Sequence, residues 1–484
     1  MGDLEPHVAT DWSDMGNCGG CSEKLMSKRK EFYLMNRHAD LVRMSTVAFL
    51  CFLFIICSGF LTSAFAQTLQ RIEVPSSLNP VGSGARALGM GGAFIAVADD
   101  ATAASWNPGG LIQLETPEVS IVGAYFNRAE DNTFGTNPEA SGSQDVSKSN
   151  TNYLSATYPF NFLRHNMVIS LNYQYLYDFT RDWKFTLIQK DLELSATQNI
   201  DYHQQGSLSA FGIAYCLQIT PQFSFGLTLN FWENGIYRNR WEQKSTQMGY
   251  GTYVGYDFTS EIRSHIQYSF SGFNANLGIL WNINSNLTVG AVLKTPFTAD
   301  LRRESTGSTA ILFPSYPAAD TRSSSSSVEE QELDMPISYG IGFAYRFSDE
   351  FTASIDIYRT EWDDYILTDS NGNRTSPISG EYIGDSDIDP THQVRMGAEY
   401  LFIKSNYVIP LRGGIFYDPA PAEGSPDDFY GLSLGSGIAY GRFLFDIAYQ
   451  YRFGNNVGTS IMKNLNFSQD ASEHTVYSSV IIHF

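Results

Sequence analysis

Three short runs in the sequence carry residues that could bind a cofactor or a metal ion. Gly82-Ser-Gly-Ala-Arg-Ala87 mimics a dinucleotide loop, but no strand precedes it and no βαβ pattern follows it. Asp369-Ser-Asn-Gly-Asn373 begins like a calcium loop, yet its glycine is misplaced and position twelve is Gly380. Cys18-Gly-Gly-Cys21 is a single CxxC pair without a second pair of ligands. We therefore predict no cofactor and no metal site.

Residues for catalysis are equally sparse. Beyond residue 57 the chain has one cysteine, Cys216, and it has no His-x-x-x-His pattern. A net charge of −20 argues against nucleic acid as a partner. We expect this protein not to be an enzyme, because the groups for nucleophilic or acid–base work are not brought together by any spacing.

Composition instead favours a β-rich membrane protein. Aromatic residues make up 14% of the chain and charged residues only 17%, with 41 glycines. From about residue 117 onward, apolar and polar residues alternate with a period of two. In residues 443–453 the apolar set begins with Phe443 and Phe445, and in residues 166–179 it runs from Met167 to Tyr177. These apolar sets should face lipid and the alternate residues a polar lumen, which predicts an all-β transmembrane antiparallel barrel.

The number and spacing of such segments predict the size of the barrel. The connections alternate between a few residues and long loops, as short periplasmic turns and long extracellular loops would, with both termini in the periplasm. Residue 484 is Phe484, and a C-terminal aromatic strand resembles the signal read by the barrel-assembly machinery. We predict 14 strands within residues 116–484, near 117–126, 151–160, 166–179, 206–218, 222–236, 264–282, 286–296, 330–347, 350–362, 391–402, 408–418, 428–441, 443–453 and 472–484.

Residues 44–66 are typical of a secretory signal peptide. Arg43 precedes an apolar run that ends in Ala64-Phe65-Ala66, so we expect cleavage before Gln67 and export to the outer membrane of a Gram-negative-type bacterium. The alternative is an uncleaved anchor helix, but no stop-transfer charges follow. Residues 1–43 lie upstream of the signal, and a true start at Met44 would make them a non-native extension.

Residues 67–115 do not follow the strand pattern. They are rich in glycine and alanine and cannot form a core of their own, so they can be compact only by packing inside the barrel. We therefore predict an N-terminal plug in the lumen.

The order of these segments is similar to that in the FadL-type transporters of long-chain fatty acids and toluene (the OmpP1/FadL/TodX family). The resemblance rests on Gly82 to Leu111, on Met335-Pro336, on Thr360-Glu361-Trp362 and on Leu411-Arg-Gly-Gly414, and it covers essentially all of the exported chain. It implies that Asn107, Pro108 and Gly109 form the bend of a hatch, where the family's Asn-Pro-Ala motif has alanine in place of Gly109.

The resemblance also implies passive uptake of hydrophobic molecules, with capture between extracellular loops and lateral release through a gap in the wall. A break in the third strand is what the family implies, although the alternation in residues 166–179 gives no independent sign of it. Loops 237–263 and 297–329 match the capture loops by position. Their apolar residues contact substrate or pack against each other to order the loops. They include Tyr250, Tyr253, Tyr256, Phe258, Ile311, Leu312, Phe313 and Tyr316.

A fatty-acid carboxylate would need a cation in the lumen. Lys294, Arg346, Arg395 and Arg412 fall at inward-facing positions, where such cations more often pair with carboxylates or anchor the plug. We predict a monomer in contact with outer-membrane lipid and lipopolysaccharide, with hydrophobic small molecules as its ligands. The alternatives are a polar-solute porin, which a plug would occlude, and a barrel serving protein interaction or secretion.

Overall fold

The structure, a computed structural model, describes residues 82–237 and 239–484. The predicted extension 1–43, the signal peptide 44–66 and the first part of the plug, 67–81, lie outside the described residues. Within the described part of the chain, no helix has the length and apolar character needed to span a membrane.

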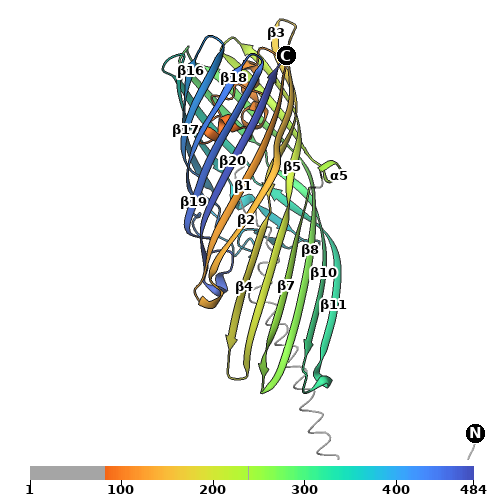
Figure 1. Cartoon of the computed structure of the whole chain (residues 1–484). Coiled ribbons are helices and arrows are strands. Elements are labelled where there is room, and N and C mark those ends of the chain that lie inside the picture. The colour runs from red at the N-terminus through yellow and green to blue at the C-terminus, as the bar shows by residue number, and fades with distance from the viewer. Residues whose placement is uncertain (1–81, 238) are drawn as a thin grey trace, which may run out of the picture. The chain divides into compact units, whose positions relative to one another are not determined.

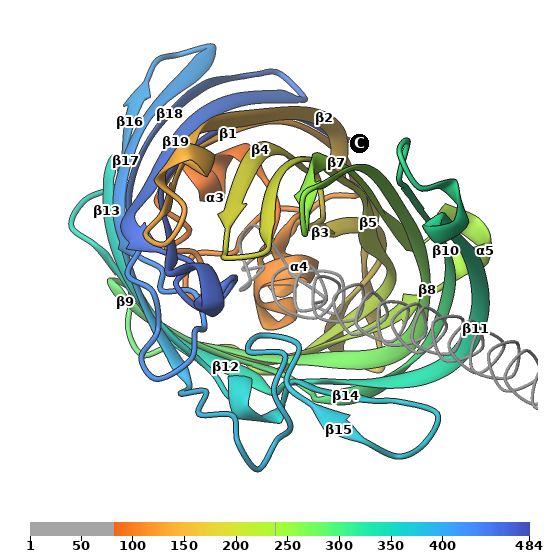
Figure 2. The same ribbon diagram turned by 90° about the horizontal axis from the view of Figure 1, so that it is seen from below.

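Fourteen antiparallel strands close into a barrel (Figures 1 and 2). The ring closes because β1 pairs with β20 on one side and with β2 on the other. The strands of the wall are β1 (Glu118–Phe134), β2 (Gly142–Phe162), β3 (His165–Asp178), β5 (Leu194–Thr220), β6 (Phe223–Trp232), β8 (Tyr256–Asn282), β9 (Leu287–Lys294), β12 (Ser338–Arg346), β13 (Phe351–Thr360), β16 (Thr391–Ile403), β17 (Tyr407–Tyr417), β18 (Tyr430–Tyr440), β19 (Phe443–Val457) and β20 (Phe467–His483).

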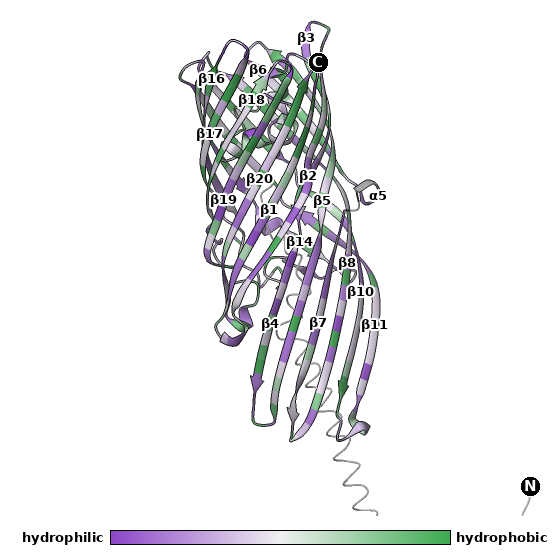
Figure 3. Ribbon diagram, viewed as in Figure 1, coloured by the Kyte–Doolittle hydropathy of each residue, from purple (hydrophilic) through white to green (hydrophobic). Residues whose placement is uncertain are grey.

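The alternation of side chains explains the two faces of this wall. On β19, Phe443 and Phe445 are exposed on the outside, whereas Asp446 and Ala448 are buried on the inside. Figure 3 shows the hydrophobic residues concentrated in the barrel wall. Each of the 14 predicted strands overlaps one strand of the wall, which confirms the predicted fold.

Tyr177 is a correction to the predicted outward set on β3. The pairing of β3 with β5 shifts between Tyr175 and Tyr177, so Leu176 forms a bulge and Tyr177 turns into the lumen. A bulge changes the face of the sheet to which the next side chain points, whereas the predicted alternation assumed a regular strand.

The predicted strand 330–347 is two strands, because Pro336 has no N–H to donate to a ladder. The first of these strands belongs to a sheet that extends the barrel beyond its long-loop end, toward the bottom of Figure 1. The N-terminal halves of β5 and β8 continue into this sheet and pair there with β4, β7 and β10. The added strands are β4 (Arg181–Lys190), β7 (Arg240–Tyr253), β10 (Phe297–Leu312), β11 (Thr321–Met335), β14 (Ile366–Thr368) and β15 (Arg374–Thr375).

The extension corrects the prediction of loops at 237–263 and 297–329. These segments are hairpins, and the middle of the β10–β11 hairpin is polar or small on both faces, as where Ser305 pairs with Ser327 and Gly307 with Ser325. Without an apolar face, the period of two leaves no trace in the sequence.

Short helical segments complete the fold. Three of them, α3, α4 and η1, belong to the plug inside the barrel (Figure 2). The helical segments are α3 (Ala85–Gly89), α4 (Ala103–Trp106), η1 (Pro108–Gln113), η2 (Pro138–Ala140), α5 (Asn234–Tyr237), η3 (Pro317–Ala319), η4 (Trp362–Asp364) and η5 (Lys463–Leu465).

Candidate transport site

Glycines in the wall let the plug approach the barrel closely. A β-carbon added at Gly397 would lie 2.2 Å from the Met90 carbonyl oxygen, and one at Gly414 would lie 2.3 Å from the Gly91 nitrogen. An added β-carbon at Gly226 would lie 2.2 Å from the main chain of Pro108. Because no side chain fits at these three positions, the wall is shaped for the plug over β6, β16 and β17.

The predicted hatch bend is firmly seated. Asn107 is fully buried, and its side-chain amide donates hydrogen bonds of 2.8 Å to the carbonyls of Ile95 and Ile279. Its Oδ1 accepts from the Gly109 N–H at 3.0 Å and so caps helix η1, with Pro108 in the first turn. The Gly109 carbonyl accepts from the Ser224 hydroxyl at 2.7 Å. The bend therefore ties the plug to β6 and β8.

Polar side chains of the wall satisfy the main chain of the plug. One carboxylate oxygen of Asp356 accepts from the N–H groups of Phe94 at 2.6 Å and Ile95 at 2.8 Å. Ser354 donates to the Ala93 carbonyl at 2.7 Å and Tyr153 to the Ala101 carbonyl at 2.9 Å. A segment without ladders needs such partners, since buried main-chain groups left unpaired are costly. Sequence reasoning did not assign these residues, whose only signal was a polar residue on the lumen face.

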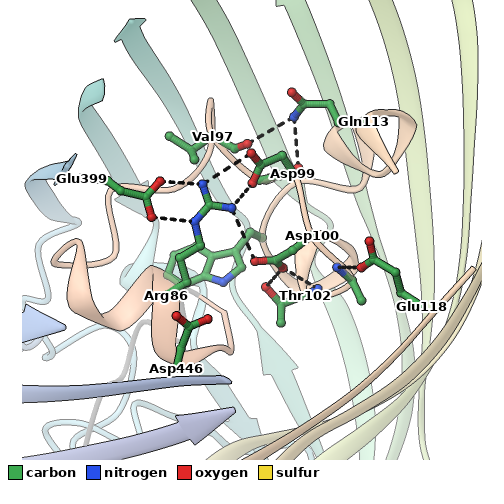
Figure 4. A network of polar contacts seen from close by, with 12 residues as sticks. Arg86, Val97, Asp99, Asp100, Thr102, Gln113, Glu118, Glu399 and Asp446 are labelled. Atoms are coloured by element: carbon green, nitrogen blue, oxygen red, sulfur yellow. Dashed lines mark hydrogen bonds and ion pairs between the residues drawn. The ribbon is translucent and has the colours of Figure 1, made fainter. Parts of the chain in front are cut away.

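Three of the four predicted carboxylate partners are involved in other contacts or lie elsewhere. Arg412 pairs with Glu399 and Asp446, both buried. Glu399 also pairs with Arg86 of the plug, as Figure 4 shows. Arg395 donates to the Gly91 carbonyl at 3.0 Å and pairs with Asp418 at 3.3 Å. The structure thus assigns both arginines to anchoring and charge pairing.

Arg346 is the last residue of β12 and lies at the short-turn end of the barrel, and its side chain is exposed. Lys294 is half-buried and lines a cavity on the other side of the plug. Of the predicted cations, only Lys294 faces this cavity.

That cavity, the upper cavity, is partly open and has a volume of about 70 Å³. One side is aromatic: Trp232 stacks on Phe297 with ring centroids 5.8 Å apart, and Tyr177 lies 6.3 Å from Trp232. Amide side chains, among them Asn230 and Gln393, line the remainder. Convergent apolar faces with a few polar groups are typical of ligand sites.

A second aromatic group continues from the upper cavity toward the extension. Trp241 lies parallel to Phe179 at 4.5 Å and to Tyr268 at 4.7 Å, and all three are buried in one cluster with Trp232. Such stacks add to the free energy of area burial. These rings form an apolar core at the base of the extension.

The predicted capture residues lie at the far tips of the extension hairpins. Phe258 packs on Phe313 at 6.1 Å and Tyr256 on Tyr316 at 6.3 Å, so four of these rings meet each other. Tyr253 is buried. Tyr250 is exposed, and Ile311 and Leu312 are half-buried at the end of β10. Phe258 is 12 residues from Phe270 along β8, about 40 Å in a strand, so the tips lie far from the upper cavity.

The wall is less regular beside a polar cavity above the plug. The ladder between β2 and β3 ends at Tyr153 and Gln174, and over residues 142–150 the ladders in the described part of the chain pair β2 with β1 alone. Leu176, the bulged residue, lines both this polar cavity and the upper cavity. Beyond this point no ladder joins β2 to β4 among the described residues, although the Gln144 side chain donates to the Lys184 carbonyl at 2.9 Å.

A closed barrel with an apolar outer face, a polar lumen and an internal plug defines this chain as an outer-membrane β-barrel. The sequence matches the family described as outer membrane protein transport protein (OMPP1/FadL/TodX) over residues 76–472. The chain therefore belongs to this family, as the resemblance predicted.

Solved structures of the same fold agree with this assignment. A FadL homologue of Pseudomonas aeruginosa is 14% identical with a TM-score of 0.52, and the match covers 83% of this chain and 98% of that one. The toluene transporter TodX of Pseudomonas putida is 12% identical with a TM-score of 0.52 and the same coverage. At these identities the likeness establishes the fold alone. No curated protein matches the sequence.

Proposed function

We propose that this protein lets hydrophobic compounds, either long-chain fatty acids or aromatic hydrocarbons, diffuse passively across the outer membrane. The observation that carries the proposal is the upper cavity, where the faces of Trp232 and Phe297 lie next to a seated plug. Burying apolar surface there is worth about 25 cal/mol per Å². TodX, which has the same fold, is by its title a toluene transporter, and this supports the hydrophobic class.

Release is proposed to be lateral, at the seam between β2 and the bulge of β3. Leu176 lies where the upper cavity meets the polar cavity, which is lined by Asp178, Arg452 and Glu473. An apolar solute gains nothing by entering a charged chamber, so the wall beside Leu176 is the better exit.

We also propose how substrate first contacts the protein and how the protein reaches the membrane. Exposed tip residues such as Tyr250 make the first contact with substrate, and the monomer sits among outer-membrane lipid and lipopolysaccharide. Residues 44–66 direct export, and the strand ending at Phe484 is read by the barrel-assembly machinery.

Uptake of labelled oleate and labelled toluene by cells expressing the chain from Met44 tests the proposal. Leu176→Asp should abolish uptake because it places a charge at the exit, and Leu176→Met should retain it. Trp232→Ala should weaken uptake more than Tyr250→Ser does. If neither compound enters faster than in cells with an empty vector, the transport proposal fails and protein interaction becomes the leading function.

A further inference from the structure

Two cavities lie on the same five strands of the wall, on opposite sides of the plug. The upper cavity was described above, and the lower cavity opens beside the short turn 283–286. Each strand contributes at least one residue to each cavity, and on each strand one such pair lies six positions apart, or about 20 Å along the strand. The pairs, upper residue first, are Asn276 and Asn282 on β8, Lys294 and Thr288 on β9, Ser338 and Ala344 on β12, Tyr358 and Thr352 on β13, and Gln393 and Glu399 on β16.

One turn of the plug separates these cavities. Ile95 is fully buried and packs against Val292 of β9 and Tyr358 of β13. It occupies space that glycines leave open, since a β-carbon added at Gly290 would lie 2.9 Å from its Cγ2 and one at Gly340 would lie 3.0 Å from its Cδ1. The Ile95 side chain therefore forms the apolar seal over β9, β12 and β13.

Both cavities are polar where they approach this seal. In the upper cavity, Asn230 Oδ1, Gln393 Nε2 and the Tyr358 hydroxyl are buried and have no hydrogen-bond partner among the described residues. Such atoms are costly unless a polar molecule meets them. The lower cavity carries charges and amides, including Arg86, Asp99, Gln113, Gln222, Asn284 and Arg346.

We propose that Ile95 is the gate of a second route, which runs through the barrel from the upper to the lower cavity and passes small polar solutes, including inorganic ions. Withdrawal of this one side chain removes the apolar layer between two polar chambers on the same strands. Hydrophobic substrates do not use this route, because charged and amide side chains make up most of the lining of the lower cavity. The inference goes beyond the proposed function and does not depend on it.

The test compares purified protein reconstituted in planar bilayers and in liposomes. Ile95→Ala should raise the ion conductance and the rate of liposome swelling in arabinose several-fold over the unaltered chain. Leu111→Ala is the matched control, because Leu111 is an equally buried residue of the plug that packs in another cluster and lines neither cavity. Equal conductance and swelling for the two variants would overturn the proposal.

A cysteine pair keeps the proposal testable if Ile95→Ala does not fold. In a Cys216→Ser background, Ile95→Cys with Val292→Cys should lose the residual conductance on oxidation and recover it on reduction. If the disulfide forms and the conductance does not change, Ile95 is not the gate. Uptake of toluene or oleate measured on the oxidised protein separates the two proposals, since it should persist when the gate is locked.

Discussion

Arg86 of the plug and Glu399 of β16 form a two-point ion pair across 313 residues of sequence. Arg86 Nε lies 3.0 Å from Glu399 Oε2, and Arg86 Nη2 lies 2.8 Å from Glu399 Oε1. Arg412 also bonds Glu399 and continues to Asp446, so charges of opposite sign alternate from the plug into the wall. Such a chain fixes the plug against β16, because a two-point ion pair between a guanidinium and a carboxylate requires one relative geometry.

Loss of the charge on Glu399 should destabilise the seated plug. Glu399→Gln leaves Arg86 and Arg412 without a shared carboxylate, and breaking buried pairs costs roughly 3–5 kcal/mol. The measurement is urea unfolding in detergent, followed by tryptophan fluorescence. The control, Glu304→Gln, removes the half-exposed partner of Arg302 and should cost at most about 1 kcal/mol. Similar losses for both variants would show that the network does not anchor the plug.

Adjacent glycines on β17 should respond differently to alanine. At Gly414 the new β-carbon meets the Gly91 nitrogen at 2.3 Å, whereas at Gly413 the nearest atom is 3.9 Å away. Gly414→Ala should therefore cost about 1–3 kcal/mol through overpacking. In limited proteolysis, the plug of the Gly414→Ala variant should be cleaved faster than the plug of the Gly413→Ala variant. A plug equally resistant in both variants would contradict the close fit.

The hatch bend should depend on the donor groups of Asn107. Asn107→Asp turns an amide that serves the Ile95 and Ile279 carbonyls into a carboxylate facing them, and each unpaired buried group costs about 1–3 kcal/mol. Hydrogen exchange of the plug amides should accelerate. Asn127→Asp is the control, since Asn127 donates to the Ser147 hydroxyl at an exposed site. Unchanged exchange in Asn107→Asp would place the bend's stability elsewhere.

Asp427, in the connection between β17 and β18, should make stability depend on pH. Burial, reinforced by the neighbouring Asp428, raises the pKa of Asp427 to about 6, although its carboxylate accepts from the Gly458 N–H at 2.7 Å. The folded state then binds a proton that the unfolded state has lost, so this contribution to stability is complete below pH ~4 and disappears as pH rises through ~6.

Asp427→Asn keeps an acceptor for Gly458 and should flatten this part of the profile. Unfolding free energies measured from pH 4 to 7 for both proteins give the difference curve. A difference that is constant over this range would contradict the raised pKa.

The sequence by itself determined the wall of the barrel. Each wall strand meets lipid on one face and a polar lumen on the other, so the contrast between residues such as Phe445 and Asp446 is written into the chain at a period of two. The plug could be predicted for a related reason. Residues such as those around Gly91 cannot build a core alone, and the lumen is the one place where they can be buried.

Only the tertiary structure decided how these parts meet. The extension escaped prediction because the middle of its β10–β11 hairpin is polar or small on both faces. Tyr177 was misplaced because one bulged residue, Leu176, changes the face to which the next side chain points. The partners of the lumen charges depend on which residue of one strand stands opposite which residue of the plug. The sequence therefore predicts Arg412 as a cation facing the lumen. Its pairing with Glu399 and Asp446 is decided only when the barrel closes.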